Sequence, residues 1–304
     1  MSPVLPKHSS SEEYAPEVTD GKPDLSGFES RELAVGGSRI RYLTGGSGPP
    51  LVLVHGLGGM ATNWRLVAPD LARERRLVIP DLPGHGHSEP LRDRFRTLDP
   101  FVDAVLAVAQ AEAALPAPFV GHSLGGLVSL HAAARRPDAV QGLVLAAAAG
   151  ISSSTRVSHA VVTVLGVVQP GKLAGRRAQA IARSPSGRRF AFWWGVSDPV
   201  GLDPAMAHAF LEGPPLHTDT LTAGQALIAS DPRTDLERVT CPALCLWGAD
   251  DNWVPVADGM EYARRLRAPL RVISGCGHLS IGERPDIVAR AIREFLESLE
   301  TGYV

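Results

Sequence analysis

The sequence predicts an α/β fold, in which a mostly parallel sheet carries helices on both of its faces. Short β-branched apolar runs alternate along the chain with longer segments of helical spacing, a rhythm typical of alternating strands and helices. Several runs are continuously apolar, as expected for strands that are buried on both faces. The expected strands lie in segments 39–46, 50–56, 76–88, 117–123, 140–148, 242–251 and 270–278. The expected helices lie in segments 61–74, 100–115, 124–137, 259–268 and 284–299.

Composition limits the classes of function that fit this chain. Its 304 residues suffice for one large α/β domain with a sizeable core. A net charge of −2 gives no field that favours nucleic acid, and the apolar runs are too short or too interrupted to span a bilayer. Three cysteines, a sparse and odd count, fit a reducing compartment. We expect a cytoplasmic monomer or homodimer with no nucleic-acid partner, membrane insertion, metal or cofactor.

The strand–helix rhythm divides the chain into four parts. Residues 1–30 are polar and rich in Pro, Ser and Glu, and are expected to form an N-terminal extension. Residues 31–150 hold the first part of the α/β core, and residues 236–304 hold the second part. Residues 151–235 show helical pieces without clear strands. Because an insertion of this kind lies at the carboxyl edge of the sheet, where ligands bind, we expect a helical lid.

The segment FVGHSLGGLV, residues 119–128, places Ser123 between Gly121 and Gly125. An apolar strand is expected before this serine and a helix after it, which is the context of a nucleophile on a sharp strand-to-helix turn. Glycines suit the turn because they have no Cβ that collides with neighbouring backbone. At a helix N-terminus, the dipole and the free N–H groups favour developing negative charge. Ser123 is therefore the predicted nucleophile.

The predicted base is His278, one of ten histidines. It follows the last expected strand and precedes the last expected helix, so it lies on a loop at the same sheet edge as Ser123. A histidine at this edge can accept the serine proton. His122 adjoins the nucleophile, and its side chain is expected to point to the other side of the turn.

An acid that orients the histidine should follow a strand between Ser123 and His278. The segment ALCLWGADDNWVPV, residues 243–256, supplies two neighbouring candidates, Asp250 and Asp251. The strand before the expected lid ends in VLAAAAGISSS and offers no carboxylate, which removes the other common location for the acid.

An oxyanion site needs two backbone N–H groups that point at the reacting carbonyl. One is expected from Leu124, directly after the nucleophile. The other is expected from Leu57, because the HGLGG segment at 55–59 follows a strand and its glycines let the backbone approach a ligand.

Taken in order, these motifs resemble the α/β-hydrolase family from about residue 31 to residue 299. The resemblance implies a mostly parallel eight-stranded sheet with a helical lid, and a Ser-His-Asp triad. The family's aspartate stands three residues before a Val-Pro pair, which makes Asp251 the acid here. In the segment DLPGHGHS, the resemblance gives Asp81 and Ser88 structural roles. Relatives that dehalogenate or open epoxides use an aspartate where this chain has serine.

The chemistry that these residues imply is acyl transfer to water, with a small-molecule ester or acyl substrate as the partner. Gly56 and two aromatic residues of the expected lid, Trp193 and Trp194, are the predicted substrate contacts. The first expectation is a carboxylesterase-like enzyme for a small to medium hydrophobic substrate. Thioester, lactone and C–C bond hydrolysis remain open, as does a ligand-binding or biosynthetic role without hydrolysis.

Overall fold

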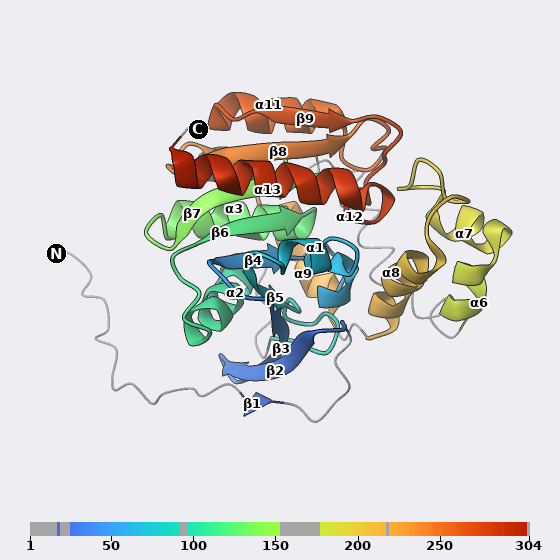
Figure 1. Ribbon diagram of the computed structural model, residues 1–304, viewed down its shortest axis with the longest axis horizontal. Helices are drawn as coiled ribbons and strands as arrows, with labels where there is room; N and C mark the ends of the chain where they lie inside the picture. Colours follow the sequence, from blue (N-terminus) through green and yellow to red (C-terminus); the bar gives the residue numbers. More distant parts are fainter. Residues whose placement is uncertain (1–16, 19–24, 92–96, 153–176, 217–218, 303–304) are drawn as a thin grey trace.

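The computed structural model describes residues 17–18, 25–91, 97–152, 177–216 and 219–302 (Figure 1). Its central element is a nine-stranded sheet in the order β1-β2-β3-β5-β4-β6-β7-β8-β9. Strands β2 to β9 provide the expected eight, and the two-residue β1 pairs antiparallel with β2 at the edge. The strands are β1 Glu17–Val18, β2 Phe28–Val35, β3 Ser38–Gly45, β4 Pro50–Val54, β5 Arg76–Pro80, β6 Ala117–His122, β7 Val140–Ala146, β8 Ala243–Gly248 and β9 Leu270–Ile273.

The sheet is parallel from β5 through β4, β6, β7 and β8 to β9, and antiparallel between β1, β2, β3 and β5. Every residue of β6 and β8 is buried, which explains why these strands are continuously apolar in the sequence. Since the strands are parallel, the carboxyl ends of β4, β6, β8 and β9 meet at one edge of the sheet. The loops that carry the predicted nucleophile, acid and base all begin at this edge.

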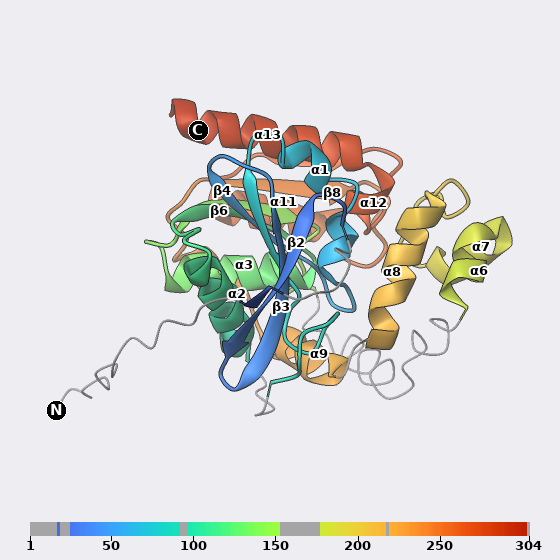
Figure 2. The ribbon, with the colours of Figure 1, turned by 60° about the horizontal axis from the view of Figure 1, so that its bottom comes forward.

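Helices cover both faces of the sheet, as Figure 2 shows in profile. One face carries α2 Asp99–Ala111, α3 Leu124–Arg135, α9 Thr220–Ala229, α10 Arg233–Leu236 and α11 Val256–Leu266. The other face carries the 3-10 helix η1 Ala61–Trp64, α1 Ala68–Leu71, α12 Ser280–Glu283 and α13 Pro285–Thr301.

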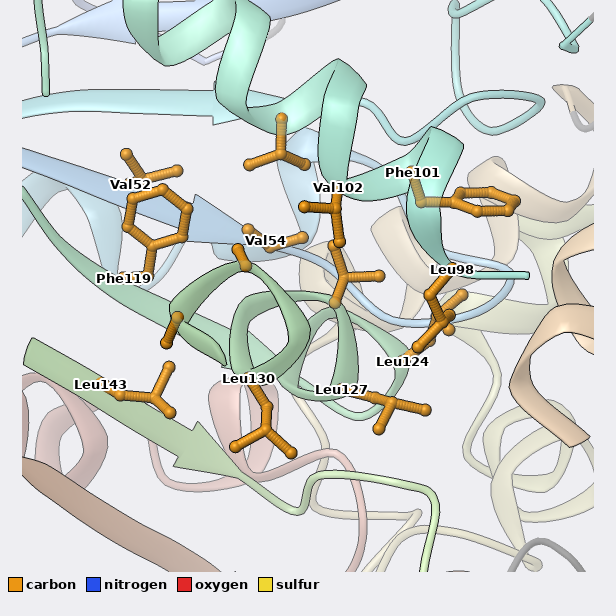
Figure 3. Close-up of a cluster of buried hydrophobic side chains, with 14 of the residues drawn as sticks. Val52, Val54, Leu98, Phe101, Val102, Phe119, Leu124, Leu127, Leu130 and Leu143 are labelled. Atoms are coloured by element: carbon orange, nitrogen blue, oxygen red, sulfur yellow. The ribbon is translucent and has the colours of Figure 1, made fainter. Parts of the chain in front are cut away.

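The core on the first face lies between the sheet and helices α2 and α3 (Figure 3). Phe119 of β6 and Leu143 of β7 lie on the sheet side, and Val102 of α2 and Leu127 of α3 lie on the helix side; all four are buried. A buried side chain of this size is stabilised by roughly 1.5–3 kcal/mol relative to an exposed one. This packing fixes α3, and with it the turn that holds Ser123.

The segment between β7 and β8 contains α6 Ala178–Arg183, α7 Pro185–Phe192 and α8 Pro204–Leu216, and then α9 and α10. Helices α6 to α8 project from the body on the side toward which β8 points (Figure 1). They enclose an apolar cluster of their own, which includes Phe192, Met206 and the body residue Leu279. Residues 178–216 are called the cap below. Of the expected lid, residues 153–176 and 217–218 lie outside the described part of the chain.

Two regions differ from the sequence-based expectation. The expected helix 61–74 is divided into η1 and α1, because Pro69 lacks the N–H that a continuous helix would need. The expected extension contributes to the sheet, since β1 and the first residues of β2 lie within residues 1–30. Its residues 1–16 and 19–24 lie outside the described part of the chain.

Candidate active site

Ser123 occupies a strained turn between β6 and α3. Its φ of 54° and ψ of −117° lie where non-glycine residues are rarely found. The turn is tight on both sides: a Cβ at Gly121 would lie 2.2 Å from the carbonyl oxygen of Gly125, and a Cβ at Gly125 would lie 2.3 Å from that of Val54. The two glycines are therefore required by close backbone approach. The strain is typical of a functional position.

His278 lies on the loop between β9 and α12 and is buried. Its Nε2 is 3.1 Å from Ser123 Oγ, within hydrogen-bond reach of a proton that it could accept. Its Nδ1 is 2.9 Å from Asp251 Oδ2. With the Nδ1 proton directed at the carboxylate, Nε2 is free to accept from the serine.

Asp251, rather than its neighbour Asp250, faces the histidine. Its carboxylate is fully buried, and Oδ1 accepts hydrogen bonds from the backbone N–H groups of Trp253 at 2.9 Å and Val254 at 2.8 Å. These donors hold the carboxylate in place and leave Oδ2 for His278. Asp250 is exposed and points instead toward the cap.

The loop after β4 lies directly against the serine. A Cβ at Gly56 would come within 3.0 Å of Ser123 Cβ. Leu57 follows Gly56, and in the described part of the chain none of the hydrogen bonds found uses its backbone N–H. Leu124 is the first residue of α3, where a helical N–H has no partner within the helix. Of the two predicted oxyanion donors, Leu124 thus follows Ser123 directly, and Leu57 follows the glycine that lies against it.

Three other histidines around the site are buried and neutral at pH 7. Burial, followed by the charge of His278, lowers the pKa of His122 to about 3. Burial also lowers the pKa of His55 to about 4 and, together with the charge of His55, that of His85 to about 3. His122 lies against the histidine loop, where its Nε2 is 2.9 Å from the carbonyl oxygen of His278. The ring nitrogens of His55 and His122 contact backbone atoms, whereas Nδ1 of His278 contacts the carboxylate of Asp251.

His55 supports the loop on which the predicted oxyanion donor Leu57 lies. Its Nδ1 is 2.8 Å from the carbonyl oxygen of Gly56, and its Nε2 accepts from the N–H of Leu82 at 2.9 Å. Asp81 is fully buried, and accepts from the N–H groups of Ala61 and His87. Ser88 Oγ donates to the carbonyl oxygen of Asp81. Asp81 and Ser88 thus hold the loops beside the site.

The aromatic residues of the cap are placed unequally. Trp193 is 72% exposed, at the surface of the cap. Trp194 is half-buried and meets Trp253 edge-on, with ring centroids 4.8 Å apart. Trp253 stacks in turn on His278 at 6.5 Å. Trp253 was not among the predicted contacts, although its place two residues after Asp251 in DDNWVP was a signal that could have found it.

A surface hollow of about 730 Å³ lies at the opposite edge of the sheet. Its lining includes Pro50, Pro118 and Pro242, which stand at the amino ends of β4, β6 and β8. Ligands of open α/β sheets bind beyond the carboxyl ends of the strands. We therefore do not assign this hollow as the candidate active site. The site lies at the edge that carries Ser123, where the residues with suitable chemistry meet.

Within the described ranges, no group of three or more His, Cys, Asp or Glu side chains is arranged to hold a metal ion. No described helix has the length and apolar character needed to cross a membrane.

Comparison with known proteins agrees with the fold. The chain belongs to the α/β hydrolase fold family, whose model matches residues 49–285. It is 30% identical to 2-hydroxymuconate semialdehyde hydrolase of Pseudomonas sp. strain CF600, over 90% of this chain and 96% of that one. It is 33% identical to pimeloyl-[acyl-carrier protein] methyl ester esterase of Chromobacterium violaceum, over 83% and 96%.

A solved structure shares the architecture. The meta-cleavage product hydrolase from Pseudomonas fluorescens IP01 superposes with a TM-score of 0.69 at 23% identity, over 88% of this chain and 97% of that one. At this identity, the likeness concerns the fold. The sequence relatives and the family together place the chain among the hydrolases.

Proposed function

We propose that this hydrolase cleaves a carboxylic ester of a small to medium hydrophobic substrate through a Ser123–His278–Asp251 triad and an acyl-enzyme. The observation that carries the proposal is the continuous contact from Ser123 Oγ to His278 and on to Asp251. A nucleophile, a base and an orienting acid in this order are the parts that acyl transfer needs.

In the first half of the reaction, Ser123 Oγ attacks the ester carbonyl while its proton moves to His278 Nε2. The carbonyl oxygen becomes an oxyanion, which the N–H groups of Leu57 and Leu124 stabilise. Asp251 stabilises the imidazolium that forms on His278. As the tetrahedral intermediate collapses, the C–O bond to the alcohol breaks, and the leaving oxygen takes the proton from His278.

In the second half, water attacks the acyl-enzyme carbonyl and gives a proton to His278 Nε2. The bond between the acyl carbon and Ser123 Oγ then breaks, and the serine oxygen recovers the proton. The products are the carboxylic acid and the free enzyme, and each proton and bond is accounted for without a cofactor.

The preference for a hydrophobic substrate rests on the aromatic side chains beside the base. Trp253 stacks on His278 and meets Trp194 of the cap, so an apolar acyl group next to the reacting carbonyl would meet aromatic surface. Gly56, which lies against Ser123, lets the substrate approach the loop backbone. Trp193 is mostly exposed and remains a predicted contact, but the preference for a hydrophobic substrate does not depend on it.

A second candidate is hydrolysis of a C–C bond next to a carbonyl. It is favoured by the likeness to 2-hydroxymuconate semialdehyde hydrolase, whereas the likeness to a methyl ester esterase favours ester hydrolysis. The same triad residues would serve both reactions, so the difference lies in the substrate that the pocket accepts.

The test is hydrolysis of nitrophenyl esters, from acetate to long acyl chains, by wild type and Ser123→Ala in parallel. We expect turnover that peaks at a short or medium acyl chain and disappears in the variant. A folded wild type without turnover on any ester, but with turnover of a vinylogous semialdehyde acid, would replace the ester proposal with C–C hydrolysis.

A further inference from the structure

Besides the ring contact of Trp194 with Trp253, the cap meets the predicted catalytic loops through hydrogen bonds of residues 195–197, which are called the strap below. The backbone N–H of His278 donates to the carbonyl oxygen of Gly195 at 2.7 Å, and the N–H of Leu279 donates to the same oxygen at 3.4 Å. The predicted base is thus held, through its own backbone, by a residue of the cap. The backbone of Gly277 lies close to that of Gly195, since a Cβ at Gly277 would lie 2.6 Å from the Gly195 carbonyl oxygen.

Glu283 joins the strap to the histidine loop from the other side. Both of its carboxylate oxygens accept from the N–H of Gly277, at 3.1 and 3.0 Å. The N–H of Ser197 donates to Glu283 Oε2 at 2.8 Å. Burial raises the pKa of Glu283, and the backbone donors of Gly277 and Ser197 offset part of that rise by stabilising the anion. One carboxylate therefore receives hydrogen bonds from the cap and from the residue before His278.

Asp250 ties the strap to the acid loop. Ser197 Oγ donates to Asp250 Oδ2 at 2.7 Å, and the N–H of Asp250 donates to the carbonyl oxygen of Cys276 at 2.9 Å. The two adjacent aspartates thus face in different directions: Asp251 toward His278 and Asp250 toward the cap. Ser197 therefore bonds to two carboxylates: its N–H donates to Glu283, and its hydroxyl donates to Asp250.

We propose that Glu283 and Asp250 are positioning residues that fasten the strap to the histidine and acid loops, so that the seating of the cap and the orientation of His278 form one coupled state. The proposal rests on the proposed function in one respect, since it takes His278 to be the base. If the strap moves away from the histidine loop, the backbone N–H of His278 loses its acceptor, the carbonyl oxygen of Gly195. The N–H of Gly277 then keeps its hydrogen bonds to Glu283. A displacement of about 1 Å at a reacting group can lower the rate on the order of 100-fold.

The test combines hydrogen exchange with kinetics on the full chain. The variants are Glu283→Ala, Glu283→Gln, which keeps one acceptor oxygen, and Ser197→Ala, which removes only the bond to Asp250. Glu297→Gln, an exposed glutamate of α13, is the matched control. We expect faster exchange in peptides covering 276–279 and 193–198 together, in the order Glu283→Ala, Ser197→Ala, Glu283→Gln, and no change in Glu297→Gln.

On a nitrophenyl ester, we expect kcat to fall about 10- to 100-fold in Glu283→Ala and a few-fold in Ser197→Ala, with KM nearly unchanged and most activity retained in Glu283→Gln. The hydrogen-exchange arm needs no substrate, so it stands even if the ester proposal fails. Exchange that rises in 276–279 while 193–198 stays protected would overturn the coupling. Unchanged exchange in both segments of Ser197→Ala would overturn it as well, even if Glu283→Ala did not fold.

Discussion

The α/β body and the cap hold their residues by different means. In the body, strands such as β6 and β8 are buried along their whole length. The residues of the proposed triad are held by close backbone contacts and by hydrogen bonds from main-chain N–H groups. The cap has a small apolar cluster with an exposed Trp193 on its surface. It contacts the predicted catalytic loops through hydrogen bonds of residues 195–197 and through the ring contact of Trp194 with Trp253.

From this difference we expect the body and the cap to have separate tasks. The packed body can hold reacting groups to within tenths of an ångström, which catalysis requires. The cap lies outside the sheet, so we expect that it can differ in shape without disturbing the body and that it selects the substrate. Substitutions in the body and in the strap should therefore affect chemistry or folding, whereas substitutions elsewhere in the cap should affect which substrate is used.

The largest effect is expected for Asp251→Asn. The amide keeps the shape of the side chain but cannot stabilise the imidazolium or hold the required tautomer of His278, so kcat should fall about 10⁴-fold. Ester turnover and circular dichroism measure activity and folding side by side. The exposed Asp286→Asn is the control, and a loss below tenfold in a folded Asp251→Asn would remove this residue from the triad.

Stability gives the next contrast. A Cβ in Gly125→Ala would lie 2.3 Å from the Val54 carbonyl oxygen, whereas one in Gly195→Ala would meet only His278 Cβ, at 3.8 Å. We expect Gly125→Ala to lose at least about 1–3 kcal/mol of unfolding free energy, the usual range for overpacking, and Gly195→Ala to stay close to wild type. Denaturant titration checks both. Equal losses would show that the cap side is packed as tightly as the body.

Substrate choice should change in Trp194→Ala and Trp253→Ala. Both residues belong to the aromatic row that ends on His278, and each aromatic pair contributes about 0.5–1.5 kcal/mol. The ratio of kcat/KM for phenylacetyl over acetyl nitrophenyl esters should fall roughly 2- to 10-fold. Trp193→Ala, which removes an exposed ring, should leave the ratio nearly unchanged; a larger effect there would place the substrate on the outer cap surface.

The smallest effect concerns the anchoring of α10 to the body. His131 of α3 lies 2.6 Å from Asp235 of α10 and 3.1 Å from Asp99 of α2. The hydrogen bond to Asp235, opposed by burial and aided by Asp99, raises the pKa of His131 above its ordinary value of 6.5.

Because the folded state holds this proton more tightly, its stabilising effect is complete below pH 6.5 and is lost as the pH rises through the raised pKa. The unfolding free energy of wild type relative to His131→Asn should therefore decline as the pH rises from about 6.5 through the raised pKa. Urea titrations across this range measure the difference. A difference that is constant with pH would show that protonation of His131 does not strengthen the contact.

The sequence was most informative where one residue type suits one physical requirement. The continuous apolar runs predicted the buried strands, and the spacing around Ser123 and His278 predicted that both lie at the carboxyl edge. The choice between Asp250 and Asp251 needed the family pattern, because both positions hold an aspartate. The carboxylate of Asp250 meets Ser197 of the strap, which is distant in the chain, whereas the carboxylate of Asp251 meets His278.

The cap was less accessible to sequence reasoning. Aromatic residues there suggested substrate contact equally for Trp193 and Trp194, but the turn after α7 leaves Trp193 exposed and brings Trp194 against Trp253. The helical spacing of residues 61–74 predicted one continuous helix. Pro69 in this segment accounts for the break between η1 and α1. The roles of Glu283 and Ser197 arise from contacts between segments 86 residues apart, which no local pattern reveals.

The most direct test of the central claim is mass spectrometry of the folded protein after treatment with a nitrophenyl phosphonate. The account predicts one phosphonyl group per chain, located on the peptide that contains Ser123, and none in Ser123→Ala. It also predicts much slower labelling in His278→Ala, because the base that activates the serine is absent. Label on another residue, or no label on Ser123 in a folded protein, would contradict the account.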